Sequence, residues 1–433
     1  MVAVADCDLR RNRENADTDR VGPTGEEKSR GVGACPDTYA SRLFDPIMKN
    51  PAIVIVAVLG SMTSNPLLAQ RSADASAAHG LTMLEEPKEH GGVQAYSIAT
   101  DGRWLAGGTG VVTASVDGVA IKRGGGDVLI WDARSGKIKR VLGKHPTSVS
   151  WLQFTGDGKS VISISGDDGE VRVWSTRGKR KKSFRLGTAL SSGLAAPQAD
   201  PAGAFLVHVE AKTLRGRVVA GQLAVWDLRK GRKAWKLDDS DVQATAISPD
   251  GKLLATFVEH MTWSKRGDAW VGKPSGRSVC LYNLGSGEQL WQVDDVARLE
   301  QLFFGDNSTV LSVEHESRRQ PKQRRGRRSR ALLVRRYEVA DGSSKAKSTS
   351  IAEERAGSLM RVSHDGKMLA AIRSMGESLA IYELATGRRV REVTFAKGRM
   401  GRGAALSGDL EMVAGTARFD PVLLRLSSKG RAR

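Results

Sequence analysis

A run of arginine and lysine residues near position 320 is the part of this sequence best suited to chemistry. It contains no acidic residue, and its members are Arg318, Arg319, Lys322, Arg324, Arg325, Arg327, Arg328 and Arg330. Guanidinium and ammonium groups bind carboxylates and phosphates through charge-assisted hydrogen bonds. A segment this polar and this self-repelling does not order itself. The run therefore predicts an irregular loop that attracts anions.

Motifs of the common catalytic sites are missing from the sequence. There is no Gly-x-Ser-x-Gly, no His-Glu-x-x-His and no Gly-x-x-x-x-Gly-Lys-Ser/Thr. Gly124-Gly125-Gly126 precedes an expected strand, so it lacks the helix N-terminus that would bind phosphate. His260 and His315 each stand beside a glutamate, and a metal site between them is a weak alternative. We expect no cofactor, no metal and no catalytic activity.

Seven short apolar segments, most of them closed by an aromatic residue, recur at steps of 43 to 56 residues. The closing positions are Trp131, Trp174, Trp226, Tyr282, Tyr337, Tyr382 and Arg425. A period of about 40–45 residues with four short strands per repeat is typical of a β-propeller blade. The sequence therefore predicts an all-β fold, a seven-bladed β-propeller with four antiparallel strands in each blade.

Two kinds of turn punctuate each repeat. Asp-Gly pairs such as Asp157-Gly158 and Asp365-Gly366 precede the apolar segment, and they join antiparallel strands tightly because they tolerate positive φ. A second glycine, such as Gly136 or Gly387, follows the aromatic residue. Each repeat is thus expected to run as strand a, Asp-Gly turn, strand b, loop, strand c, glycine turn and strand d.

The repeats resemble those of the WD40 family over residues 80–426. The second repeat is the closest match, with Gly143-Lys144-His145, Asp168 and Trp174 at the characteristic positions. In that family a His, an Asp, a Ser or Thr and a Trp form a buried hydrogen-bonded network. The resemblance implies a structural role for His145, Asp168 and Trp174. The serine position falls near Ile164, so we expect the network to be incomplete.

Four repeats have long insertions between strands b and c. They span residues 107–127, 211–221, 259–277 and 314–331. All b–c loops of a propeller leave the same face, and insertions often mark the binding face. Blades three to five supply three of them, and these carry Trp263, Lys265, Arg266 and Trp270 beside the arginine run. Because aromatic residues and arginine dominate interface energies, we expect a recognition surface here. The alternative is a solubilising surface.

A Gly-x-x-x-Trp pattern occurs in two repeats, at Gly231 to Trp235 and Gly287 to Trp291. It is similar to the tryptophan-docking repeats of quinoprotein propellers. That resemblance implies that the Trp locks adjacent blades together. No calcium-ligand cluster or adjacent cysteine pair accompanies it. A quinoprotein-like dehydrogenase, or a hydrolase or lyase with a site in the channel, is therefore only an alternative.

The seventh repeat ends with strand c, and a basic tail at 427–433 follows it. A propeller ring has to close, because an open sheet edge invites aggregation. Residues 81–84, just before the first strand a, are the only candidate for the missing strand. We expect them to pair with residues 422–426 and so to close the last blade.

The N-terminal region is typical of a targeting segment. Residues 48–69 combine a short basic start, an apolar core and a small residue before Gln70, which is the pattern of a signal peptide starting at Met48. The apolar core is too short to span a bilayer, which takes about 20 residues. We expect residues 1–47 to be a disordered leader or a mis-assigned start, and 70–79 to be a linker. The pattern predicts a periplasmic or secreted protein; a cytoplasmic one is the alternative.

Cysteine content and charge agree with a non-catalytic module. Cys280 is the only cysteine in the repeats, and a lone thiol on an apolar strand behaves as a small hydrophobe. The chain has a formal net charge of +19, which favours a partner of negative charge. We expect a protein-interaction or scaffold module of the cell envelope whose basic b–c face binds an acidic protein or an anionic envelope polymer. An intracellular propeller that binds nucleic acid is disfavoured by the signal peptide.

Overall fold

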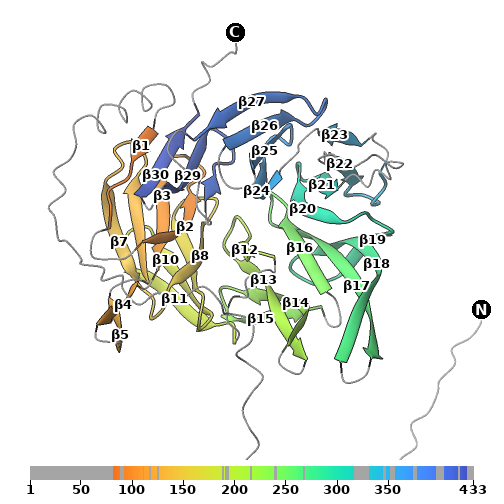
Figure 1. Ribbon diagram of the computed structural model, residues 1–433, viewed down its shortest axis with the longest axis horizontal. Coiled ribbons are helices and arrows are strands. Elements are labelled where there is room, and N and C mark those ends of the chain that lie inside the picture. The colour runs from red at the N-terminus through yellow and green to blue at the C-terminus, as the bar shows by residue number, and fades with distance from the viewer. Residues whose placement is uncertain are drawn as a thin grey trace, which may run out of the picture. The chain divides into compact units, whose positions relative to one another are not determined.

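The computed structural model describes residues 81–426 apart from short gaps, of which 316–330 and 396–403 are the longest. These residues form seven four-stranded antiparallel sheets and one small two-stranded sheet (Figure 1). The fold is therefore the predicted all-β, seven-bladed propeller. The described part of the chain contains no helix long and apolar enough to cross a membrane. The regions expected at 1–47, 48–69, 70–79 and 427–433 lie outside the described residues.

Each blade consists of strands that we designate a to d, from the inner edge of the sheet to its outer edge. Blade 1 contains β2 (Val93–Ile98), β3 (Trp104–Thr109), β6 (Asp127–Asp132) and β7 (Ile138–Lys144). Blade 2 contains β8 (Val149–Phe154), β9 (Ser160–Ser165), β10 (Glu170–Ser175) and β11 (Arg180–Arg185). Blade 3 contains β12 (Gln198–Ala199), β13 (Phe205–Leu214), β14 (Arg217–Asp227) and β15 (Arg232–Lys236). Blade 4 contains β16 (Asp241–Ile247), β17 (Leu253–Arg266), β18 (Ala269–Asn283) and β19 (Gln289–Asp294).

The remaining three blades follow the same order. Blade 5 contains β20 (Leu299–Phe304), β21 (Thr309–His315), β22 (Leu332–Glu338) and β23 (Thr349–Ile351). Blade 6 contains β24 (Ala356–Val362), β25 (Met368–Arg373), β26 (Ser378–Glu383) and β27 (Arg389–Thr394). Blade 7 contains β28 (Ala405–Leu406), β29 (Met412–Ala417), β30 (Asp420–Arg425) and β1 (Leu81–Met83).

The last blade closes as predicted. β1 pairs antiparallel with β30, with Leu81 opposite Leu424 and Met83 opposite Val422. The backbone N–H of Leu84 then donates to the carbonyl of Pro421 at 3.1 Å. One blade thus combines the first and the last strand of the described chain, so no strand c is left as an open edge.

The hydrophobic core is divided among the junctions between blades. Seven separate clusters of buried side chains occur, and each joins one blade to the next. Strands b and c are therefore covered on both faces. A strand buried on both faces has a continuous apolar sequence and no alternation, which explains segments such as Val128 to Trp131 in β6.

Tryptophan side chains couple blades 3, 4 and 5, as the Gly-x-x-x-Trp pattern implied. The indole N–H of Trp235 in blade 3 donates to the carbonyl of Leu284 in blade 4 at 2.8 Å. Trp291 of blade 4 donates in the same way to Val339 of blade 5 at 2.8 Å. A Cβ added to Gly287 would meet the Trp235 ring at 2.7 Å, so the ring lies directly on this glycine. The tryptophans have a structural role.

The long b–c insertions, which were expected only as loops between strands b and c, form paired β-strands in three of the four blades. In blades 3 and 4 the strands themselves continue, and β13–β14 and β17–β18 are long hairpins whose tips project beyond the ring in Figure 1. In blade 1 the insertion forms a separate hairpin of β4 (Val112–Val116) and β5 (Val119–Arg123). Backbone hydrogen bonding across the two strands satisfies their polar groups, which a disordered loop would leave to water.

Replacement of Gly287 by Ala tests the coupling between blades 3 and 4. Gly287 has φ +77°, and its added Cβ would also collide with Trp235. Gly158 has φ +65° with no atom within 4 Å of an added Cβ, so Gly158→Ala is a matched control for backbone strain alone. We expect the control to lose about 1 kcal/mol and Gly287→Ala to lose clearly more, measured by urea unfolding. Equal losses would show that the tryptophan contact contributes nothing to stability.

Candidate binding surface and the polar network beside it

The β17–β18 hairpin of blade 4 has a proximal part inside the blade and a distal part outside it. The flanking strands end at the pairs Asp241–Glu259 and Ser278–Asp294. Beyond this level the ladder continues with two strands alone, from His260 opposite Gly276 to Arg266 opposite Ala269. We call residues 260–276 the blade 4 arm.

Four of the predicted binding residues belong to the blade 4 arm. Trp263 is opposite Gly272, Lys265 is opposite Trp270, and Arg266 is opposite Ala269. Because directly paired residues and residues two apart share a face of a ladder, the register places Trp263, Lys265 and Trp270 on one face. Arg266, one residue further along the strand, belongs to the opposite face. The backbone therefore brings two aromatic residues and one lysine together.

The predicted arginine run lies outside the described residues. Its members Arg318, Arg319, Lys322, Arg324, Arg325, Arg327, Arg328 and Arg330 all fall in the gap at 316–330. The strands on either side of this gap are paired, with His315 of β21 opposite Leu332 of β22. The run is thus inserted between strands b and c of blade 5. The blade 4 arm is inserted between the same two strands of the neighbouring blade.

A polar cavity of about 380 Å³ lies at the base of the blade 4 arm, between blades 4 and 5. Its lining includes Glu259, Arg277, Arg298 and Glu300. Arg277 Nε donates to Glu259 Oε1 at 2.8 Å, and this pair spans the last rung inside the blade. Carboxylate and guanidinium groups are equal in number here. The cavity therefore does not select a ligand by charge.

Beside this cavity, three side chains that occur together in hydrolases are arranged in a different order. The Ser278 hydroxyl donates to Asp294 Oδ1 at 2.6 Å, and His260 Nε2 lies 2.8 Å from Ser278 Oγ. This hydrogen bond holds the pKa of Asp294 below its usual value. Because the serine proton is held by the carboxylate, the histidine is not placed to remove it. Among the described residues there is no group of three or more side chains able to hold a metal ion.

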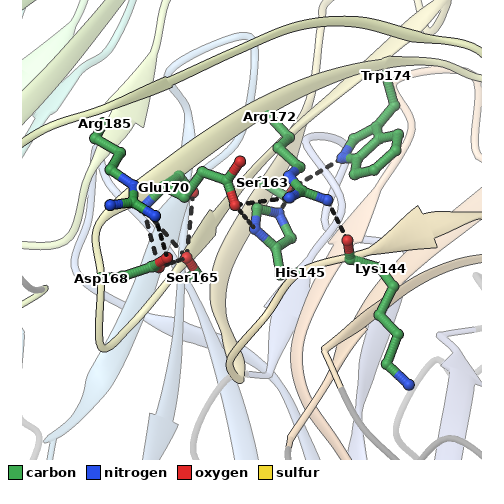
Figure 2. A network of polar contacts seen from close by, with 9 residues as sticks. All are labelled: Lys144, His145, Ser163, Ser165, Asp168, Glu170, Arg172, Trp174 and Arg185. Carbon is green, nitrogen blue, oxygen red and sulfur yellow. Dashed lines mark hydrogen bonds and ion pairs between the residues drawn. The ribbon is translucent and has the colours of Figure 1, made fainter.

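A buried polar network joins blades 1 and 2 (Figure 2). His145 follows β7 and is 1% exposed. Its Nε2 lies 2.8 Å from the Ser163 hydroxyl, and the Trp174 indole N–H donates to the same hydroxyl at 2.7 Å. Ser163 thus occupies the serine position, which was expected near Ile164. The network is still incomplete, because among the described residues His145 Nδ1 has no hydrogen-bond partner and the link to Asp168 is missing. Ser163 pairs with Arg172, and Arg172 stands two residues before Trp174. This register determines which residue of β9 faces the histidine.

Carboxylates in the β9–β10 turn and at the start of β10 extend this network. Glu170, not Asp168, has the carboxylate nearest to His145, with 3.7 Å between Oε2 and Nδ1. Glu170 also pairs with Arg172 at 2.8 Å. Asp168 instead accepts a hydrogen bond from Ser165 and lies 3.8 Å from the guanidinium of Arg185. Sequence reasoning missed Glu170 and Arg172, because nothing in the motif specifies them.

Burial removes the candidate proton carriers of the core from the neutral range. It lowers the pKa of His145 to about 3, with the Arg172 charge acting in the same direction. It lowers the pKa of His208 to about 4 and raises that of the Cys280 thiol to about 11. General acid–base catalysis is most effective when the pKa lies near the working pH. These three groups are suited to packing.

Acid should weaken the fold through His145. The unfolded histidine binds a proton near its ordinary pKa of 6.5, whereas the folded one does so only near 3. Stability therefore falls as pH falls through this window, by up to about 1.4 kcal/mol per pH unit. We expect urea unfolding of His145→Gln to show a shallower pH dependence than the parent between pH 6.5 and 4. An unchanged slope in His145→Gln would contradict this account.

Comparison with known proteins supports a WD40-like propeller. Residues 136–175, which run from strand d of blade 1 to strand c of blade 2, match the family model "WD domain, G-beta repeat". The chicken (Gallus gallus) Denticleless protein homolog is 28% identical over 34% of this chain and 22% of its own length. Pre-mRNA-processing factor 19 homolog 2 of Arabidopsis thaliana is 28% identical over 39% of this chain and 30% of its own length. The aligned region is thus less than a third of either relative.

Two solved structures share the fold. The Cps50 (Swd1) β-propeller domain of Myceliophteria thermophila has a TM-score of 0.55 at 13% identity and covers 80% of this chain and 98% of its own. Kuenenia stuttgartiensis hydrazine synthase has a TM-score of 0.54 at 15% identity and covers 78% of this chain and 97% of its own. Identities this low show the fold alone. Together with the His145–Ser163–Trp174 network, the matches identify this chain as a divergent WD40-like β-propeller.

Proposed function

We propose that this chain is a non-catalytic interaction scaffold of the cell envelope whose b–c face, on blades 3 to 5, binds an acidic protein. The blade 4 arm is the observation that carries the proposal. It extends two strands beyond the blade, from His260 opposite Gly276 to Arg266 opposite Ala269, and no neighbouring strand needs this extension for its own pairing. A hairpin that leaves its sheet offers side chains to a partner.

The composition of this face fits an acidic partner. The register groups Trp263, Lys265 and Trp270 on one face of the arm. The insertion of blade 5 adds eight basic residues at the same end of the neighbouring blade. Tryptophan supplies apolar contact area, and arginine supplies paired hydrogen bonds to carboxylates. The non-catalytic part of the proposal is supported by the buried histidines and thiol, whose pKa values lie far from neutrality.

Binding of polyglutamate to the full chain tests the acidic-partner proposal. The test variant carries Arg324→Gln, Arg325→Gln and Arg327→Gln. A control variant with the same charge change carries Lys252→Gln, Lys367→Gln and Arg388→Gln, which are exposed and outside the b–c ends. We expect the test variant to bind at least about tenfold more weakly in 50 mM salt, by analogy with other multiply charged contacts, and the control to bind like the parent.

Equal weakening of both variants would mean that polyglutamate responds to net charge alone, and the b–c face would lose its assigned role. Capture of envelope proteins on the parent and on both variants then identifies the natural partner. A partner lost from the arginine variant and kept by the control is the expected result.

The envelope location rests on the targeting segment at 48–69 and has its own test. In a bacterial host we expect export and cleavage after Ala69, so that the mature chain begins at Gln70 on N-terminal sequencing. Ala69→Trp should block cleavage, because the residue before the cut must be small, whereas Ala77→Trp should leave it unchanged. An uncleaved chain recovered only from the cytoplasm would contradict the location and leave the binding proposal standing.

A further inference from the structure

The outer edges of blades 1, 2 and 3 carry a second basic surface, separate from the b–c face. It comprises residues 137–144, 177–185 and 229–236, which cover β7, β11 and β15 and most of the turns before them. These segments contain four, six and five basic residues and no acidic one. We call them the basic belt. Figure 1 shows β7, β11 and β15 following one another along the outside of the ring.

Most cations of the basic belt are available to a ligand. All of its lysine and arginine residues are exposed except Lys182, which is half-buried. A minority pair with acidic residues of the inner strands, among them Lys233 with Glu210 at 2.8 Å and Lys230 with Asp227 at 3.6 Å. Others, such as Lys179, Arg180 and Arg232, have no side-chain ion pair within the described structure. Exposed cations without partners leave a strong positive field.

The three segments form one continuous surface. Arg140 of blade 1 reaches the next blade and donates to the carbonyl of Thr176 at 2.6 Å. Lys182 of blade 2 reaches blade 3 in the same way and donates to the carbonyl of Arg229. At the next junction, the corresponding position is taken by Trp235, which contacts Leu284. Cations thus link the blades of the belt, and an aromatic residue marks its end.

Beyond this junction the charge changes abruptly. The equivalent segment of blade 4, residues 285–294, contains Glu288 and Asp294 and no basic residue. Lysine on an edge strand commonly serves to prevent edge-to-edge pairing. A protective role would apply to blade 4 as much as to blades 1 to 3. The equivalent segment of blade 6, residues 385–394, combines three arginines with Glu392, so basic segments without any acidic residue are restricted to three consecutive blades. This restriction indicates a ligand.

The chemistry of the basic belt narrows the class of ligand. Its two aromatic residues, Phe184 and Trp235, are half-buried and engaged, since Phe184 stacks on Trp226 and Trp235 lies on Gly287. Single-stranded nucleic acid is usually held by free aromatic stacking platforms, which are missing from the belt. Val141 is its one exposed large hydrophobic residue, whereas protein interfaces depend on apolar anchors and are poor in lysine. A duplex, with a persistence length of about 150 base pairs, would have to bend to follow the belt, and this bending costs energy.

We propose that the basic belt binds a flexible linear polysaccharide that carries sulfate, phosphate or carboxylate groups on its sugars. Such a chain needs charge contacts alone and bends around three neighbouring blades. Lysine- and arginine-rich stretches of this kind occur in patches that bind heparin or nucleic acid, and the missing stacking platforms favour the polysaccharide. The proposal is independent of the b–c face, because the two surfaces share no residue.

Heparin binding to the full chain, measured by calorimetry at several salt concentrations, tests the belt. The belt variant carries Lys139→Gln, Arg180→Gln and Arg232→Gln, one exposed residue from each blade. The control variant is again Lys252→Gln, Lys367→Gln and Arg388→Gln. We expect the belt variant to bind at least about tenfold more weakly in 50 mM salt, and its plot of log affinity against log salt to be shallower by about two to three, since each lost contact removes close to one unit. Control and parent should agree.

Two further probes make the result decisive. Neutral dextran should not bind, and polyglutamate should bind the belt variant as well as it binds the parent. Equal loss of heparin binding in the belt and control variants would overturn the proposal in favour of a net-charge effect. A single-stranded oligonucleotide that binds more tightly than heparin, and is lost in the belt variant, would overturn it in favour of nucleic acid. Both results leave the polyglutamate test of the b–c face unaffected.

Discussion

Packing between neighbouring blades is the interaction on which the rest of this molecule depends. Each sheet has two apolar faces, and it can bury them only by having a blade on either side. The seven clusters each contain nine or more buried hydrophobic residues, and a fully buried large one contributes about 1.5–3 kcal/mol. A single hydrogen bond contributes about 1 kcal/mol. The apolar junctions therefore hold the ring, while polar contacts such as Trp235 to Leu284 and His145 to Ser163 fix the register of one blade against the next.

Ring closure follows from the same constraint. Without residues 81–85, the cluster between blades 7 and 1 would lose Leu84 and the cover over Trp131, whose indole N–H donates to the carbonyl of Glu85 at 3.0 Å. The short strand before blade 1 is thus a structural requirement. The outer strands are less constrained in sequence, because the outer edge of each is open to solvent. They can differ in charge from blade to blade, and the basic belt uses that freedom.

Much of the fold was predictable from the sequence, because the features that specify it are local and repeated. The strand c segments, the Asp-Gly turns and the spacing gave the seven blades, and elimination gave the pairing of residues 81–83 with 422–424. Features that depend on cross-strand register were not predictable. Ser163 was missed by one position, since a shift of one residue exchanges the faces of a strand. The insertions of blades 3 and 4 were taken for loops because their polar residues conceal a hairpin that backbone pairing stabilises. The belt was missed because its three segments are far apart in sequence and meet only through the ring.

The central claim of this account is that one closed ring, completed by the pairing of β1 with β30, presents two separate basic surfaces. Hydrogen–deuterium exchange of the full chain tests the closure most directly. The account predicts that amides of β30 exchange as slowly as those of an interior strand such as β18 near Val279 to Tyr282. Exchange of β30 as fast as that of the outer strand β27 would contradict it, because the last blade would then end in an unpaired edge.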